Sequence, residues 1–151
     1  MAQQQTDSCG RKCVYLAGPF FNDTEIANIR YAESVLTQKG LRFFSPMRHT
    51  VDAEPQTTKW ARKLFEMDKA EIGKADLVVA LYYGSNGDTG TAWECGYAAA
   101  IGKPVVLVHI NRDHDSNLMM HCGCTTNIYL DELAAYDFET LPVFPYTGKM
   151  F

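Results

Sequence analysis

Three acidic residues lie where a solvent-facing role fits poorly, and their grouping suits sugar chemistry. Asp68 interrupts an apolar helical stripe, Glu94 lies beside Trp93 on a face shared with Ala98, and Asp88 occupies the turn just before. The stripe around Asp68 consists of Trp60, Leu64 and Ile72. Cleavage through an oxocarbenium-like sugar cation needs such carboxylates, because one acid attacks or stabilises the anomeric carbon while another protonates the leaving group.

Each acid also has a simpler explanation, and spacing alone leaves both readings open. Asp88 has the position of a turn or N-cap aspartate. Glu94 could be an early-turn acid that favours the positive end of the helix dipole. Asp68 could pair with Lys63 or Lys69.

The elements that must position these acids alternate between strand and helix. We expect strands at 13–17, 41–45, 76–83 and 104–109, and helices at 22–39, 57–73, 89–102 and 128–135. Residues 46–57 read as a loop or lid, and 111–126 as a polar loop. The alternation predicts a single α/β domain over 13–151, flavodoxin-like or Rossmann-like, with a mostly parallel sheet flanked by helices. Residues 1–12 are predicted to be a disordered tail.

Two loops rich in Gly, Asp and Asn, 18–23 and 84–90, follow the first and third expected strands. In a flavodoxin-like order these strands flank the point where ligands bind. Gly18 and Asp23 are therefore candidate substrate-binding residues. Neither a dinucleotide fingerprint nor a Walker loop is present, so no nucleotide cofactor is expected.

The composition favours a small-molecule substrate. The formal net charge is −4 and no run of Lys or Arg exceeds two residues, which argues against a nucleic acid polymer as partner. No apolar stretch is long enough to span a membrane, and the first residues do not resemble a signal peptide. Five cysteines without framework spacing suggest a cytoplasmic protein with reduced thiols. The segment His121 to Cys124 lacks the ligand spacing of a zinc site, so no metal is expected.

An ordered set of motifs resembles the nucleoside 2-deoxyribosyltransferases over residues 13–151. The set comprises VYLAGPFF at 14–21, Asp68, DTGTAWECGYA at 88–98, Asn117-Leu118-Met119 and an aromatic residue at the C-terminus. The resemblance implies that Glu94 attacks C1′ of a 2′-deoxynucleoside and forms a deoxyribosyl ester, which a second nucleobase resolves with overall retention. It also implies that Tyr15 holds Glu94 by a hydrogen bond.

The same resemblance assigns further residues to the substrates. Asp68 and Asp88 would lie around base and sugar, and Phe20 and Phe21 would give the base a stacking wall. The resemblance also gives three candidate substrate-binding residues in the C-terminal half of the chain: Asn117, Met119 and Phe151.

The resemblance further implies a homo-oligomer without cofactors that acts in nucleotide salvage, a dimer at least and possibly a hexamer. Asn117 and Met119 would come from a neighbouring subunit, and the terminal carboxylate of Phe151 would reach the base. Some members end in Tyr instead. Phe151 favours the class that accepts both purines and pyrimidines.

Two alternatives remain, one enzyme of the same superfamily and one protein of a different class. A 2′-deoxynucleoside 5′-monophosphate N-hydrolase of the same superfamily would need a phosphate pocket, for which Ser45, Arg48 and Ser85 are candidates, although a terminal carboxylate nearby would repel phosphate. A non-catalytic nucleotide-sensing module would bind without turnover and would leave the inward-facing acids unexplained.

Overall fold

A five-stranded, all-parallel sheet forms the centre of the computed structural model, which describes residues 10–151. Most of the expected N-terminal tail lies outside the described residues. The strand order is β2-β1-β3-β4-β5, which is the flavodoxin-like order. The strands are β1 (Cys13–Ala17), β2 (Arg42–Phe44), β3 (Leu77–Tyr82), β4 (Val105–His109) and β5 (Thr126–Tyr129). The predicted fold class is therefore confirmed, and the strand order reverses between β1 and β3 as expected.

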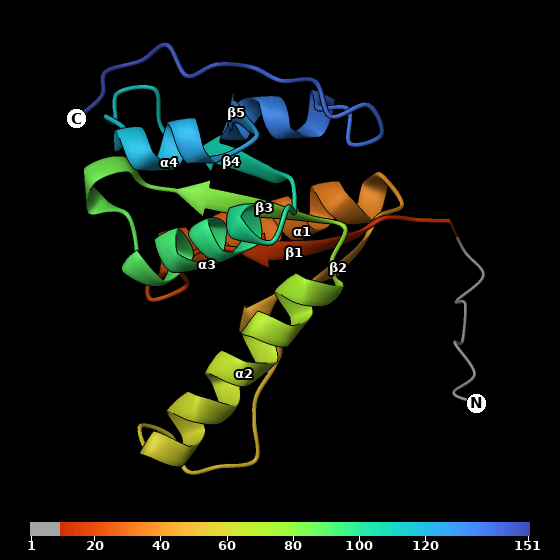
Figure 1. Ribbon diagram of the computed structural model, residues 1–151, viewed down its shortest axis with the longest axis vertical. Coiled ribbons are helices and arrows are strands. Elements are labelled where there is room, and N and C mark those ends of the chain that lie inside the picture. Colours follow the sequence, from red (N-terminus) through yellow and green to blue (C-terminus); the bar gives the residue numbers. More distant parts are fainter. Residues whose placement is uncertain (1–9) are drawn as a thin grey trace.

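Helices cover both faces of this sheet (Figure 1). One core lies between the sheet, α1 (Asp23–Gln38) and the 3₁₀ helix η3 (Leu130–Ala135). The other lies between the sheet, α2 (Thr58–Lys74), α3 (Thr89–Ala100) and α4 (Leu118–Gly123). β3 is buried along its whole length because helices cover both faces of the sheet. This burial explains why its sequence is a continuous apolar run.

Each of the three long helices begins directly after a residue whose side chain caps it. Asn22 accepts a hydrogen bond from the backbone of Glu25 and starts α1, Thr57 starts α2 in the same way, and Asp88 starts α3. α2 projects from the body of the molecule beyond the sheet (Figure 1). None of the helices in the described range is long and apolar enough to cross a membrane.

The chain between β4 and η3 differs from the prediction. The expected polar loop 111–126 contains the six-residue helix α4, and the expected helix at 128–135 is a short fifth strand followed by η3. β5 is only four residues long and includes the polar Asn127, so it lacks the apolar run that identifies a buried strand. Two further short 3₁₀ helices, η1 (Pro46–Arg48) and η2 (Gly84–Asn86), lie in the loops after β2 and β3.

Candidate active site

The hydroxyl of Tyr15 donates a 2.6 Å hydrogen bond to Oε1 of Glu94. Tyr15 is fully buried in β1, and Glu94 lies in the second turn of α3, which packs on that strand. Burial raises the pKa of the Glu94 carboxyl to about 7, an effect that the Tyr15 hydrogen bond opposes and the charges of Asp68 and Asp88 reinforce. Burial and the neighbouring Glu94 also raise the pKa of Tyr15, so its phenol remains a donor. The expected contact is present, and the catalytic role of these residues stays a prediction.

Asp68 shares a cavity of about 300 Å³ with Glu94. Burial, followed by the charge of Glu71, raises the pKa of Asp68 to about 6. Its Oδ1 is buried and has no hydrogen-bond partner among the described residues. A buried carboxylate oxygen without a hydrogen-bond partner destabilises the folded protein. Such an oxygen is typical of a functional group that finds its partner in a ligand. The cavity is lined by Phe65, Asp68, Lys69, Ile72, Gly90, Trp93 and Glu94.

The lysines that could have neutralised Asp68 are engaged elsewhere. Lys63 donates to the backbone oxygen of Asp52. The Lys69 ammonium lies over the rings of Phe65 and Tyr97, 5.9 and 5.7 Å from their centroids. The ion-pair explanation of Asp68 is therefore wrong for the described structure.

For Asp88, the simpler explanation is correct. Its Oδ2 accepts from the backbone nitrogen of Thr91 at 2.8 Å and from the Thr91 hydroxyl at 3.0 Å, which caps α3. A role toward substrate would come in addition to this capping. Glu94 lies beyond the first turn, where the influence of the helix dipole has largely fallen off. The dipole explanation of Glu94 is correspondingly weaker.

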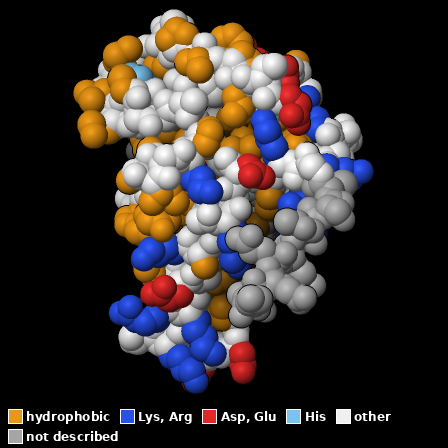
Figure 2. Space-filling view, turned by 45° about the vertical axis from the view of Figure 1, so that its right-hand side comes forward, with side chains coloured by type: hydrophobic (Ala, Val, Ile, Leu, Met, Phe, Trp, Pro, Cys, Tyr) orange, Lys and Arg blue, Asp and Glu red, His pale blue; other side chains and the backbone are white. Residues whose placement is uncertain are grey.

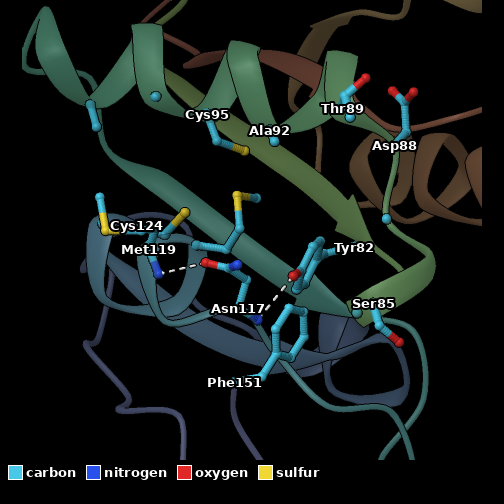
Figure 3. A pocket seen from close by; sticks show the side chains of 16 residues that line it. Tyr82, Ser85, Asp88, Thr89, Ala92, Cys95, Asn117, Met119, Cys124 and Phe151 are labelled. Atoms are coloured by element: carbon cyan, nitrogen blue, oxygen red, sulfur yellow. Dashed lines mark hydrogen bonds between the residues drawn. The ribbon is translucent and has the colours of Figure 1, made fainter.

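A second cavity, of about 620 Å³, lies on the other side of α3, between α3 and α4 (Figure 3). Asp88 lies at its rim, and Asn117 and Phe151 lie side by side across from Cys95. The Asn117 side chain accepts from the backbone nitrogen of Met119, and its own backbone nitrogen donates to the Tyr82 hydroxyl. Within one chain, the Asn117 loop and the C-terminus therefore line a different cavity from Glu94.

Met119 and its surroundings are open to solvent. The Met119 side chain is 75% exposed, and several other large hydrophobic side chains are at least partly exposed. Figure 2 shows hydrophobic side chains gathered along one margin of the molecule, above the Lys and Arg side chains at the projecting end. Such an apolar surface is typical of a region that contacts another protein chain.

The loop between β1 and α1 holds the other candidate substrate-binding residues. Gly18 has a positive φ of 157°, and a side chain there would meet Ile29 and Leu81 at about 3 Å. Phe20 and Phe21 stack on each other with ring centroids 6.2 Å apart, and both are exposed. Asp23 is the exposed first residue of α1, and the loop leaves β1 close after Tyr15.

Sequence reasoning missed the aromatic wall of the Glu94 cavity. Trp93 stacks on Tyr97 with centroids 5.2 Å apart, and Phe65 meets Trp93 edge-on at 5.1 Å. A usable signal was present, because Phe65 lies one helical turn before Asp68 and Trp93 directly precedes Glu94.

No group of three or more His, Cys, Asp or Glu residues within 10–151 could hold a metal ion. His121 instead contacts the Ser116 hydroxyl through Nδ1 at 3.2 Å. The described cysteines are free thiols, and Cys95 is buried beside Cys124.

Comparisons with known proteins point in one direction. Residues 14–129 match the family model described as nucleoside 2-deoxyribosyltransferase. A nucleoside deoxyribosyltransferase from Limosilactobacillus fermentum is 28% identical over 97% of this chain and 94% of its own length. The structure of a 2-deoxyribosyltransferase from Bacillus psychrosaccharolyticus is 34% identical, with a TM-score of 0.82 over 89% of this chain and 99% of that one. A CMP N-glycosidase from Clostridium botulinum, 22% identical with a TM-score of 0.56 over 86% of this chain and 94% of that one, shares the fold.

Proposed function

Because this chain belongs to the nucleoside 2-deoxyribosyltransferase family, we propose that it exchanges the base of 2′-deoxynucleosides through a deoxyribosyl ester on Glu94. The observation that carries the proposal is the partly buried Glu94 carboxylate, held by Tyr15 and sharing a cavity with Asp68. Buried, paired carboxylates with raised pKa values are typical of sites that break glycosidic bonds.

The reaction proceeds by two displacements at C1′. The Tyr15 hydrogen bond occupies Oε1, while Oε2 of Glu94 accepts no hydrogen bond from the described residues and is the oxygen that attacks. The C1′–O bond forms as the C1′–N bond breaks, and the electron pair leaves on the base nitrogen. A nitrogen of a second base then attacks C1′ and releases the carboxylate. Two inversions give overall retention.

Asp68 is the better of the two aspartates for handling the proton. A pKa of about 6 leaves a fraction of Asp68 protonated near neutral pH, so it can give a proton to the departing base and take one from the incoming base. Asp88 is committed to the cap of α3 through Oδ2, and we assign it to orienting sugar hydroxyls.

A second copy of the chain completes the site. Asn117, Met119 and Phe151 line the cavity on the side of α3 that Glu94 does not face. If they take part in the reaction, they do so at the Glu94 of a neighbour, for which the exposed Met119 side chain is suitably placed. A symmetric dimer would exchange these loops reciprocally.

The environment of two phosphate-pocket candidates favours exchange over hydrolysis of a 5′-monophosphate. Arg48 forms a two-pronged ion pair with the buried Glu33, with Nε and Oε1 2.9 Å apart. The backbone nitrogen of Ser85 lies 3.3 Å from the Asp115 carboxylate, which would repel a phosphate. Arg48 is therefore committed to Glu33, and Ser85 lies beside an acidic side chain that disfavours an anion.

The test is incubation of the protein with thymidine and free adenine, followed by separation of nucleosides. We expect 2′-deoxyadenosine and thymine in equal amounts, and no reaction when the ribonucleoside uridine replaces thymidine as donor. Release of deoxyribose 5-phosphate from deoxynucleoside monophosphates, without exchange, would favour the hydrolase. Binding without turnover of any donor would favour the sensing module.

A further inference from the structure

The C-terminal strap, residues 144–151, is fastened to the Asn117 loop by backbone hydrogen bonds. Ser116 N donates to Lys149 O at 2.9 Å, and Phe151 N donates to Ser116 O at 3.0 Å. Leu118 N donates to Phe151 O at 2.9 Å. Asn117 and Phe151 therefore lie side by side (Figure 3), and a shift of the strap moves both.

Tyr146 joins the strap to the body of the protein through its ring and its hydroxyl. Its ring stacks on His109 with centroids 4.6 Å apart and lies tilted against His121 at 4.9 Å. Its hydroxyl donates to Lys149 O at 2.8 Å, and His114 O lies 3.3 Å away. A Cβ at Gly148 would fall 2.4 Å from this hydroxyl, so glycine is needed there to admit it.

The two histidines are themselves held in one orientation. The Asn127 amide nitrogen donates to His121 O at 3.1 Å, which turns Oδ1 toward Nε2 of His109 at 3.0 Å. His109 therefore carries its proton on Nε2, and burial lowers its pKa, which keeps the ring neutral. His121 contacts Ser116. These ring contacts and hydrogen bonds thus connect β4 and β5 to the loop that carries Asn117.

We infer that Tyr146, which packs against His109 and His121, is a positioning residue that fixes Asn117 and Phe151 for the substrate. The part of this inference that concerns substrate rests on the proposed function. Tyr146 contacts no reacting atom in this arrangement. It acts through the strap, so its loss weakens substrate binding more than it slows the bond-breaking step.

The experiment compares Tyr146→Phe with the matched control Tyr136→Phe. The Tyr136 side chain is buried, and its hydroxyl donates to the C-terminal segment, at Pro142 O 2.9 Å away, but this bond lies outside the strap. Amide hydrogen exchange is followed in full-length protein at residues 116–118 and 149–151, together with steady-state base exchange. Gly148→Ala gives a second route to displacing the Tyr146 hydroxyl.

For Tyr146→Phe we expect faster exchange at those amides, by about 5-fold for one lost hydrogen bond. KM for the deoxynucleoside should rise by a similar factor, about 5-fold, with kcat within about 2-fold. Gly148→Ala should do the same, and Tyr136→Phe should leave both measurements at the wild-type value.

Unchanged amide exchange in both Tyr146→Phe and Gly148→Ala would overturn the inference whatever the enzyme does. A loss of kcat at constant KM would overturn the assignment to substrate positioning. A wild-type protein that exchanges no bases would contradict the proposed function, while amide exchange would still decide whether Tyr146 fixes the strap.

Discussion

Glu94 and Cys95 are neighbours in the chain, yet their side chains line two different cavities on opposite sides of α3. Glu94 shares its cavity with Asp68, whereas Cys95 faces the cavity that also holds Asn117 and Phe151. A site that uses both sets therefore needs two copies of the chain. This arrangement gives the oligomeric proposal a direct test.

Two inactive variants should restore each other when they assemble together. Glu94→Gln keeps an intact Asn117 loop, and Asn117→Ala keeps an intact Glu94. In a mixed symmetric dimer one site receives both native residues. After co-refolding equal amounts we expect about a quarter of wild-type activity from random pairing. Activity no higher than that of the separate variants would show that Asn117 serves its own chain or none.

Tyr15→Phe removes the hydrogen bond to Glu94 while keeping the ring in the core. A hydrogen bond to a charged group contributes about 1.5–3 kcal/mol, so we expect kcat/KM to fall roughly 10- to 100-fold. The exposed Tyr31 of α1 offers a control, since Tyr31→Phe should leave the rate unchanged. Equal rates for wild type and Tyr15→Phe would remove Tyr15 from the mechanism.

Base exchange should depend on pH through the ionisation of Glu94 and Asp68. Attack needs the carboxylate of Glu94, whose pKa is about 7, and protonation of the departing base needs the acid form of Asp68, whose pKa is about 6. We therefore expect a bell-shaped profile of kcat/KM with its maximum between about pH 6 and 7. Asp68→Asn removes a negative charge that raises the pKa of Glu94 and should move the rising limb to lower pH. Tyr15→Phe removes a hydrogen bond that lowers it and should move the limb to higher pH. Shifts in the opposite directions would contradict the assignment of the limb to Glu94.

The same pKa makes Glu94 unfavourable for stability at high pH. Its folded-state pKa is raised above the ordinary value of 4.5, so the folded state holds the Glu94 proton more tightly than the unfolded state does. The stability that this proton contributes is fully present below pH 4.5 and is lost as pH rises through about 7. Glu94→Gln should therefore raise Tm at pH 8, by about 2–4 °C per kcal/mol of relieved desolvation, and change it little at pH 4. Thermal unfolding at both pH values measures this, and a variant destabilised at pH 8 would contradict it.

The C-terminal carboxylate can be separated from the strap that carries it. Adding two residues after Phe151 keeps its backbone bonds to Ser116 and Leu118 possible but moves the carboxylate away. We expect a higher KM for the acceptor base in the extended protein, and a larger defect when Phe151 is deleted. Wild-type kinetics in the extended protein would exclude a role for the terminal carboxylate.

The sequence was sufficient to predict the parallel sheet and the position of Asp68, but not the division of the candidate residues between two cavities. β1, β3 and β4 are recognisable as apolar runs, and the interrupted stripe indicates the partly buried face of α2 on which Asp68 lies, although Ile72 is the only fully buried residue of that helix. The Tyr15–Glu94 contact joins residues 79 positions apart and came from the family resemblance, because spacing cannot show it. The two cavities could not be foreseen, since α3 periodicity does not say where the 117 loop and the C-terminus fold back.

The most direct test of the account is the intact mass of the protein after brief exposure to a deoxynucleoside without acceptor base. We expect a gain of one deoxyribosyl group, located on the peptide that contains Glu94, which disappears when adenine is added. Glu94→Ala should show no gain, and base exchange should fall by a factor on the order of 10⁴ to 10⁶. Base exchange that persists in Glu94→Ala, or an adduct located on another residue, would contradict the central claim.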